Sequence, residues 1–239
     1  FRGTDAFVML FCEEIRLSYF LCTDCDSRYE IRKDSMREVS IVIPNYNGKH
    51  FLENCLKAVL AQTIENQEVI VVDNGSTDGS LEYLETFPGV RVIALDRNYG
   101  FCHAVNKGIQ ASEGEYVILL NNDTEADENF AAELLRTIKR DERIFSCSSR
   151  MVQFYDRERM DDAGDYYCAL GWAFGRGKGN PVEDYDEPKD VFAACAGAAI
   201  YRKKMLESLG YFDEIHFAYL EDIDIGYRAR IQGFRNVYA

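Results

Sequence analysis

Residues 39–73 read VSIVIPNYNGKHFLENCLKAVLAQTIENQEVIVVD, a stretch in which two short apolar runs flank a helical pattern. The runs at 39–44 and 68–73 are rich in Val and Ile, as is typical of buried strands. Between them, residues 49–62 carry apolar side chains at the three- and four-residue spacing of an amphipathic helix. A strand, a helix and a second strand in this order predict a crossover unit with two parallel strands.

The alternation continues along the chain. Further strands are predicted at 90–95, 116–120 and 144–152, and a strand or buried segment at 191–201. Further helices are predicted at 78–87, 101–112, 127–140, 202–209 and 220–232. This order predicts an α/β fold with a mostly parallel central sheet and helices on both faces. Residues 153–190 are polar and interrupt the pattern, which predicts a long loop. Residues 1–37 differ from the rest, and we expect an N-terminal extension with a helical segment at 7–21 and a linker, before one domain at 38–239.

The composition is acidic. Asp and Glu total 41 against 27 for Lys and Arg in 239 residues, which gives a formal net charge of −14. Binding to nucleic-acid phosphates needs a surplus of Lys and Arg, so we expect no nucleic-acid partner. An anionic ligand would depend on backbone N–H groups, a bound cation or a few placed basic residues. The longest apolar stretches, at 6–12 and 191–201, are shorter than the roughly 20 residues of a membrane span.

The chain begins with Phe1, so we expect it to be a processed product or a piece of a longer protein. We expect a cytoplasmic location, with any contact to the inner face of the cell membrane made through parts outside this chain. Eight cysteines at irregular spacing, several of them in apolar segments, favour buried reduced thiols over a disulfide framework. Cys22 and Cys25 lack a second pair at zinc-ribbon spacing, so we expect two ordinary thiols there.

Polar turns follow each of the first four predicted strands, at 45–48, 73–79, 96–101 and 121–123. Because the carboxyl ends of parallel strands meet at one edge of a sheet, and ligands bind there, these turns predict a binding site. Each turn taken alone also suits ordinary turn chemistry. The chain contains neither GxGxxG after the first strand nor GxxxxGK[ST], which argues against a dinucleotide-dependent dehydrogenase or a P-loop nucleotidase.

Five motifs resemble glycosyltransferases of family 2. They are VSIVIPNYN (39–47), VVDNGSTDGS (71–80), NYGF (98–101), LLNNDT (119–124) and YLEDID (219–224). Their order and spacing are most similar to the rhamnosyltransferase-like branch that builds bacterial surface polysaccharides, and the resemblance covers residues 39–239. It implies a GT-A fold and an inverting transfer of sugar from a UDP- or dTDP-sugar donor to a hydroxyl of a glycan or lipid-linked acceptor.

The resemblance also assigns residues to the donor. Asp73 would accept the imide N–H of uracil or thymine, Tyr46 would flank the base, and Pro44 would shape the turn. The rest of the donor pocket would include Asn98, Gly100 and Asn122.

The resemblance implies a divalent cation, Mg²⁺ or Mn²⁺, held by Asp123. The family's DxD metal motif is here Asn121-Asn122-Asp123, which leaves one carboxylate. Family members usually supply a further metal-binding His after the last helix, whereas this chain ends at Ala239. The resemblance therefore implies a domain truncated at its C-terminal end.

Asp222 resembles the family's catalytic base, with Glu221 beside it to orient the acceptor. Acidic residues in the first turn of a helix are also favoured by its dipole, and Asp224 is expected simply to pair with Arg228. The small residues at 194–200 fit either close approach to a ligand or tight core packing. For the whole chain, the alternatives to an active transferase are a catalytically weak nucleotide-sugar-binding module and an inactive fragment. A nucleotidyltransferase is disfavoured, because residues 44–49 lack its Gly-rich basic loop.

Overall fold

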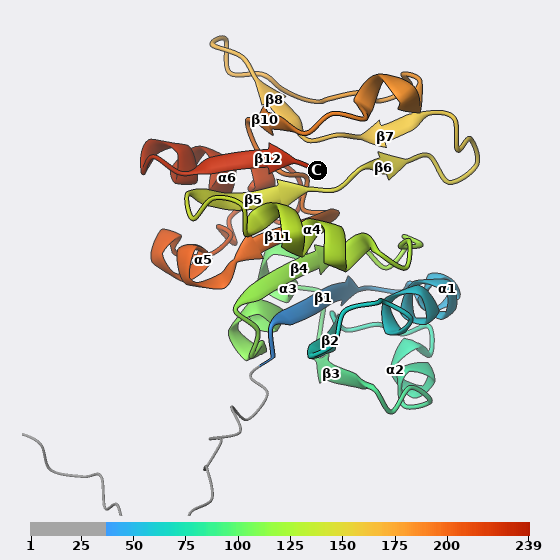
Figure 1. The fold of residues 1–239 in the computed structure, drawn as a ribbon. Coiled ribbons are helices and arrows are strands. Elements are labelled where there is room, and N and C mark those ends of the chain that lie inside the picture. Colours follow the sequence, from blue (N-terminus) through green and yellow to red (C-terminus); the bar gives the residue numbers. More distant parts are fainter. Residues whose placement is uncertain (1–36) are drawn as a thin grey trace, which may run out of the picture. The chain divides into compact units, whose positions relative to one another are not determined.

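Eight strands form the central sheet of the computed structural model, which describes residues 37–239 (Figure 1). In spatial order they are β10 (Lys189–Val191), β12 (Arg235–Tyr238), β5 (Ile144–Ser148), β11 (Ala198–Arg202), β4 (Tyr116–Leu120), β1 (Val39–Asn45), β2 (Gln67–Asp73) and β3 (Val90–Ala94). Strand β1 pairs in parallel with β2 and β4, β2 with β3, and β12 with β5. Strand β11 is antiparallel to both neighbours, and β10 is antiparallel to β12. The prediction of a mostly parallel sheet is confirmed.

Helices cover both faces of this sheet, also as predicted. One face carries α1 (Lys49–Leu60), α2 (Ser80–Leu84) and α4 (Phe130–Ile138), and the other carries α3 (Phe101–Ala111), α5 (Lys203–Leu209) and α6 (Glu221–Ile231). Alternation along β1 builds both cores: Ile41 and Ile43 pack with the first group, whereas Val42 packs with the second.

Several boundaries differ from the prediction because polar side chains form local turns. The helix predicted at 78–87 is only Ser80–Leu84, since the Asp78 carboxylate accepts the Ser80 N–H (3.0 Å) and caps the turn before it. The helix predicted at 127–140 begins at Phe130, after a turn closed by the Asp127 carbonyl. The strand predicted at 144–152 divides into β5 and β6 (Met151–Val152), because Arg150 turns away to bind Asp186.

The prediction of a long loop at 153–190 is wrong. The segment contains β7 (Met160–Asp162), β8 (Asp165–Tyr167), β9 (Ala173–Gly175), a 3-10 turn (Val182–Tyr185) and β10. Strand β7 pairs with β6, and β8 pairs with β9. A small apolar cluster of Met160, Ala163, Val191 and Tyr238 supports them, which the polar composition concealed. Residues 191–201, expected as a strand or buried segment, contain the end of β10, the buried Ala193, Ala194 and Ala196, and β11 from Ala198. Strand β12 was not predicted.

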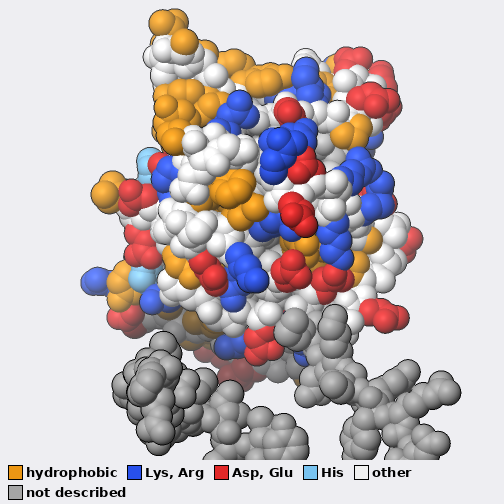
Figure 2. All heavy atoms as spheres, turned by 60° about the vertical axis from the view of Figure 1, so that its left-hand side comes forward, with side chains coloured by type: hydrophobic (Ala, Val, Ile, Leu, Met, Phe, Trp, Pro, Cys, Tyr) orange, Lys and Arg blue, Asp and Glu red, His pale blue; other side chains and the backbone are white. Residues whose placement is uncertain are grey.

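The β8–β9 hairpin carries an exposed apolar tip. Hydrophobic side chains gather at the top of the molecule in Figure 2, where Figure 1 shows this hairpin, and Leu170 and Trp172 are 86% and 74% exposed. No helix within residues 37–239 has the length and apolar character to span a bilayer. Cys55, Cys102 and Cys147 are buried free thiols, in agreement with the expected reduced state. The predicted helix at 7–21, the linker and the Cys22–Cys25 pair lie outside the described residues, and the domain boundary at 37/38 stays a prediction.

Candidate active site

Three of the predicted turns are joined by side-chain hydrogen bonds at the carboxyl edge of the sheet. The Asn45 Nδ2 group, at the end of β1, donates to Asp73 Oδ2 at the end of β2 (2.8 Å). Asn122, after β4, donates from Nδ2 to Asn45 Oδ1 (2.7 Å). Asn45 is only 1% exposed, so these buried hydrogen bonds hold the ends of β1, β2 and β4 together. The expectation that these turns meet at one edge is confirmed.

The fourth turn joins through Asn74, the residue after Asp73. Asn74 Nδ2 donates to Asn98 Oδ1 and to the Gly100 carbonyl, both at 3.0 Å, and its Oδ1 accepts the Tyr99 N–H at 3.0 Å. Asn98 Oδ1 also accepts the Gly100 N–H at 2.9 Å. Asn98 and Gly100 therefore belong to the same edge, as predicted, but their polar groups are engaged within the chain.

Asp73 lies deeper than its predicted role requires. Its exposed fraction is 0%, and its two oxygens accept hydrogen bonds from Asn45 Nδ2 and from the Ser76 N–H (2.9 Å). By contrast, Tyr46 is 50% exposed directly after β1, and Pro44 is the partner of Val72 in the β1–β2 register. Tyr46 is therefore the most exposed of the predicted donor-site residues and can contact a ligand directly.

Gly100 fixes the position of the loop that precedes Glu221. Its φ of +93° is a conformation that side-chain-bearing residues rarely adopt, and a Cβ there would lie 2.6 Å from the Phe217 carbonyl oxygen. The next N–H, of Phe101 at the start of α3, donates to that same oxygen at 2.7 Å. A pair between His103 Nδ1 and Glu214 Oε2 (2.8 Å) holds the loop further along α3. The edge of the sheet and the start of α6 are therefore connected.

Asp123 offers an exposed carboxylate after β4. Within residues 37–239 it forms no ion pair, and no group of three or more acidic, His or Cys side chains is arranged to hold a metal ion. One carboxylate fits a cation such as Mg²⁺ that takes its remaining ligands from substrate phosphates and water. Asp123 is therefore compatible with a cation shared with a diphosphate, and it would be a weak site by itself.

Glu221 and Asp222 begin helix α6 in a partly buried environment. Glu221 is 7% exposed, and its Oε2 has no hydrogen-bond partner. Burial, reinforced by the neighbouring Asp222 charge, raises the pKa of Glu221 to about 7. Burial also raises the pKa of Asp222, although the N–H groups of Ile223 (2.8 Å) and Ala196 hydrogen-bond to its carboxylate and oppose that shift. Asp224 forms the expected pair with Arg228, Nε to Oδ2 at 2.9 Å.

The loop at 192–197 connects Asp222 with the turn that carries Asp123. Ala196 donates its N–H to Asp222, and the carbonyl of the next residue, Gly197, accepts the Asn121 N–H at 2.8 Å. Ala194 and Ala196 are each 2% exposed, so the small residues of this loop serve tight packing. The same packing brings the backbone against Asp222. Close approach of this loop to a ligand stays a prediction.

Two further carboxyl groups, Asp162 and Asp165, lie near Asp222 and were not singled out from the sequence. Burial, with the Asp222 charge as a further cause, raises the pKa of Asp162 to about 6 and that of Asp165 to about 8. They lie in the segment that the sequence pattern presented as loop. The sequence Asp162-Ala-Gly-Asp165 resembles an ordinary polar turn, so no sequence pattern marked these two aspartates as site residues.

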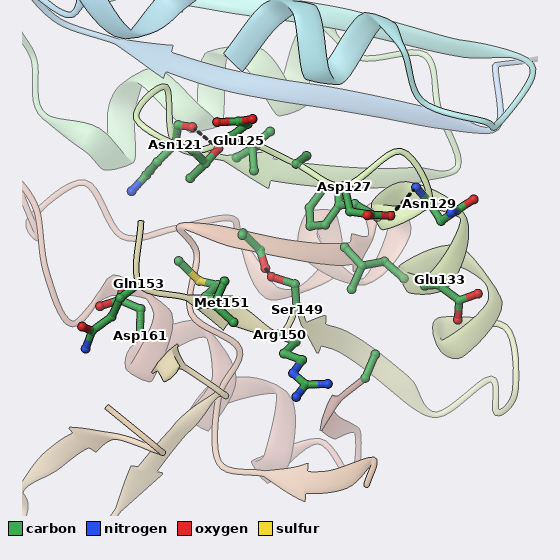
Figure 3. Close-up of a pocket in the computed structure, with 18 of the residues that line it drawn as sticks. Asn121, Glu125, Asp127, Asn129, Glu133, Ser149, Arg150, Met151, Gln153 and Asp161 are labelled. Carbon is green, nitrogen blue, oxygen red and sulfur yellow. Dashed lines mark hydrogen bonds between the residues drawn. The ribbon is translucent and has the colours of Figure 1, made fainter. Parts of the chain in front are cut away.

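A cavity of about 890 Å³ lies beside Asp123, between α4 and the β5–β6 segment (Figure 3). Asn121 and Glu125 line one side, Glu133 lies on α4, and Arg150 and Gln153 lie opposite. Neither Glu221 nor Asp222 lines this cavity. It therefore adjoins the predicted cation position without containing the predicted base.

Comparisons with known proteins agree with this architecture. The chain is 35% identical over 105 residues to the glycosyltransferase GlyG of Streptococcus pneumoniae, which covers 42% of this chain and 35% of that protein. It is 34% identical over 89 residues to TuaG of Bacillus subtilis, a putative teichuronic acid biosynthesis glycosyltransferase, covering 36% and 35%. The chain thus spans about a third of the length of these curated relatives.

Solved structures share the fold. Their sequence identity to this chain is low, but their backbones superpose well. GalNAc-T7, solved with UDP, GalNAc and Mn²⁺, superposes with a TM-score of 0.70 at 20% identity over 86% of this chain and 43% of that chain. Staphylococcus aureus TarS gives 0.63 at 20% identity over 84% and 58%. The predicted GT-A fold is confirmed. The family model "Glycosyl transferase family 2" matches residues 40–210, well over half of the 239 residues. The chain belongs to glycosyl transferase family 2.

Proposed function

We propose that the chain is the catalytic domain of an inverting glycosyltransferase that uses a nucleoside diphosphate sugar, with UDP or dTDP as the nucleotide. The acceptor is a hydroxyl of a glycan or of a lipid-linked saccharide in cell-surface polysaccharide synthesis, as the likeness to the rhamnosyltransferase-like branch suggests. The likeness to TuaG, a putative teichuronic acid biosynthesis glycosyltransferase, supports this substrate class. Solved neighbours bound to UDP-GlcNAc or to GDP-mannose with Mn²⁺ support a nucleotide-sugar donor.

One observation carries the proposal. The 192–197 loop hydrogen-bonds both to Asn121, in the turn of Asp123, and to Asp222 at the start of α6. An inverting transfer needs two functions on opposite sides of one anomeric carbon: stabilisation of the leaving diphosphate and removal of the acceptor proton. A single loop that contacts both candidate groups supports this division of roles.

Asp222 is the proposed base. Its carboxylate takes the proton of the acceptor hydroxyl as that oxygen attacks the anomeric carbon, while the bond to the diphosphate oxygen breaks on the other side. A raised pKa suits this task, because a base with a pKa closer to the working pH accepts a proton more readily. Glu221, buried beside it, orients the acceptor.

The donor binds along the carboxyl edge of the sheet. Tyr46 stacks against the nucleobase. Asp73 keeps acceptor lone pairs beyond its bonds to Asn45 and Ser76, and it reads the imide N–H once the entering base displaces the side chains that leave Asp73 0% exposed. Pro44, Asn98, Gly100 and Asn122 complete the pocket. Asp123 holds Mg²⁺ or Mn²⁺, and the cation, when bound, offsets the charge of the diphosphate.

Calorimetric titration of the chain with UDP, dTDP and GDP, each with and without Mg²⁺ or Mn²⁺, tests the donor. We expect UDP or dTDP to bind only weakly without the cation and GDP to bind less well. Full-length protein with the preferred donor sugar then tests the stereochemistry by NMR of the product anomer. Binding without turnover would favour the nucleotide-sugar-binding module, and a retained anomer would contradict inversion.

A further inference from the structure

Four carboxyl groups from two segments of the chain converge around the proposed base. We call Asp162, Asp165, Glu221 and Asp222 the carboxyl cluster. The Asp222 charge acts on each of the other three, and Asp165 also senses Asp162 and Glu221. Asp162 and Asp165 belong to the β7–β8 segment, 56 or more residues before Glu221 in the sequence. The cluster is therefore formed by the tertiary fold and not by a local sequence motif.

Backbone hydrogen bonds hold Asp165 in this position. Its N–H donates to the Ala193 carbonyl and its own carbonyl accepts the Phe192 N–H, both at 2.9 Å. The same loop continues to Ala196, whose N–H binds the Asp222 carboxylate. Asp165 and Asp222 are therefore attached to one short loop, at points three to four residues apart along it.

The cluster has no ion-pair partner. Within residues 37–239 none of its members forms a salt bridge, and Lys178, whose charge acts on Asp162, is paired with Asp161 at 3.3 Å. A positive charge on His216 would lower the pKa of Glu221 and of Asp222. Cys195 is partly buried and Tyr201 is fully buried, and the pKa of each is raised, so both stay uncharged. Asp165 Oδ2 and Glu221 Oε2 are buried without any hydrogen-bond partner in the described part of the chain.

Four unpaired negative charges in a partly buried space are strongly unfavourable, so the cluster must take up protons or a cation. The carboxylates of residues 37–239 are not arranged as a metal site, which leaves protonation. Burial and three like charges raise the pKa of Asp165 to about 8, above the values of about 6 for Asp162 and about 7 for Glu221. Asp222 instead accepts two backbone N–H bonds, which favour its charged form.

We propose that Asp165 is a positioning residue that remains a neutral carboxylic acid while Asp222 is ionised, so that the cluster presents its negative charge on the proposed base. The role for Asp222 rests on the proposed function, whereas the protonation state of Asp165 does not. A neutral Asp165 also lowers the charge that an incoming diphosphate meets.

The test is a pH titration of the full chain labelled with ¹³C at the aspartate carboxyl carbons. We expect one carboxyl resonance with a midpoint near pH 8 that is lost in Asp165→Asn and kept in Asp161→Asn, the matched control in which an exposed neighbouring carboxylate is removed. The Asp222 resonance, identified by its loss in Asp222→Asn, should keep its midpoint in Asp165→Asn, because Asp165 is neutral throughout that range.

Two results would overturn the proposal. One is the absence of any aspartate that titrates above about pH 6.5 in the parent chain. The other is a lowered Asp222 midpoint in Asp165→Asn, which would mean that a negative charge had been removed. If Asp165→Asn fails to fold, judged by its amide spectrum, Asp165→Ser replaces it, and the parent titration alone still decides the first point. No donor is present, so these outcomes are independent of UDP binding, which tests the proposed function.

Discussion

The backbone N–H of Asn121 donates a 2.8 Å hydrogen bond to the carbonyl oxygen of Gly197. Gly197 follows Ala196, whose N–H binds Asp222. A Cβ on Gly197 would lie 3.2 Å from Asn121 Nδ2, so the Asn121 side chain also packs closely against Gly197. Because the link consists of backbone groups, a shift of the 192–197 loop would displace the Asp123 turn and the proposed base together.

The first prediction concerns the cation. We expect Mg²⁺ or Mn²⁺ to strengthen UDP binding to the chain, and Asp123→Ala to abolish most of that gain, because Asp123 is the carboxylate proposed to hold the metal–diphosphate complex. Calorimetry with and without EDTA measures the gain. Glu125→Ala is the matched control, since Glu125 is also exposed and two residues away. UDP affinity that is indifferent to EDTA and to Asp123→Ala would remove the cation from the proposal.

The second prediction concerns Asp73. Asp73→Ala should weaken UDP binding by about 1.5–3 kcal/mol, the range for a lost hydrogen bond to a charged group. The same substitution removes the partners of Asn45 and Ser76, so Tm should fall as well. Asp96→Ala, a carboxylate just after β3 bound to the Tyr99 hydroxyl, serves as the control. A lower Tm with unchanged UDP affinity would mean that Asp73 only holds the turn.

The third prediction concerns the base. In the full-length protein Asp222→Asn should lower kcat by about 10²–10⁴-fold and leave UDP binding nearly unchanged, because only proton transfer is lost. Asp224→Asn, on the same turn of α6 and paired with Arg228, should have a much smaller effect on kcat. Near-parental turnover of Asp222→Asn would move the role to Glu221, which Glu221→Gln then tests.

The pH dependence of transfer follows from the same residues. A base acts in its ionised form, and burial raises the pKa of Asp222 from its ordinary value and that of Glu221 to about 7. We therefore expect kcat/KM to fall as the pH drops from neutrality, at a higher pH than an exposed aspartate would produce. An acid limb centred near the ordinary aspartate value, about 4, would contradict a buried base.

The carboxyl edge of the sheet was predictable because its signals are local. Each apolar strand ends in a short polar turn, and the topology of parallel strands then brings the turns together. The Asn45–Asp73 and Asn74–Asn98 bonds follow from that geometry. The depth of Asp73 was not predictable, because burial depends on how neighbouring turns close over a strand end.

The β7–β8 segment was not predictable for a different reason. Its strands are three residues each, and the pairing of Asp165 with Ala193 is isolated, so no hydrophobic period marks it. Its polar residues indicate a loop when read alone. Asp162 and Asp165 acquire their environment only through contact with the 192–197 loop and α6, which lie far along the chain.

The fourth prediction tests the contact between α3 and the loop before α6. In Gly100→Ala the added Cβ would meet the Phe217 carbonyl in addition to straining a backbone at φ +93°. Gly210→Ala is the matched control, since φ there is +85° and nothing lies within 4 Å of the added Cβ. We expect Gly210→Ala to cost about 1–2 kcal/mol of unfolding free energy, and Gly100→Ala about 1–3 kcal/mol more. Only Gly100→Ala should weaken UDP binding, and equal losses in the two variants would refute the contact.

The last prediction concerns stability. The pKa of Asp165 is about 8 in the folded chain against an ordinary value of 3.8, so between these values the folded state holds a proton that the unfolded state releases. The stability that this group contributes is therefore complete below about pH 4 and is lost as the pH rises through about 8. Asp165→Asn cannot ionise and escapes that loss. We expect its unfolding free energy, minus that of the parent, to increase by up to about 1.4 kcal/mol per pH unit across this window and then to level off. Partial exposure of Asp165 reduces the slope. Urea denaturation of both proteins at several pH values measures the difference, with Asp161→Asn as the control, and parallel curves for Asp165→Asn and the parent would show that Asp165 is ionised in the fold.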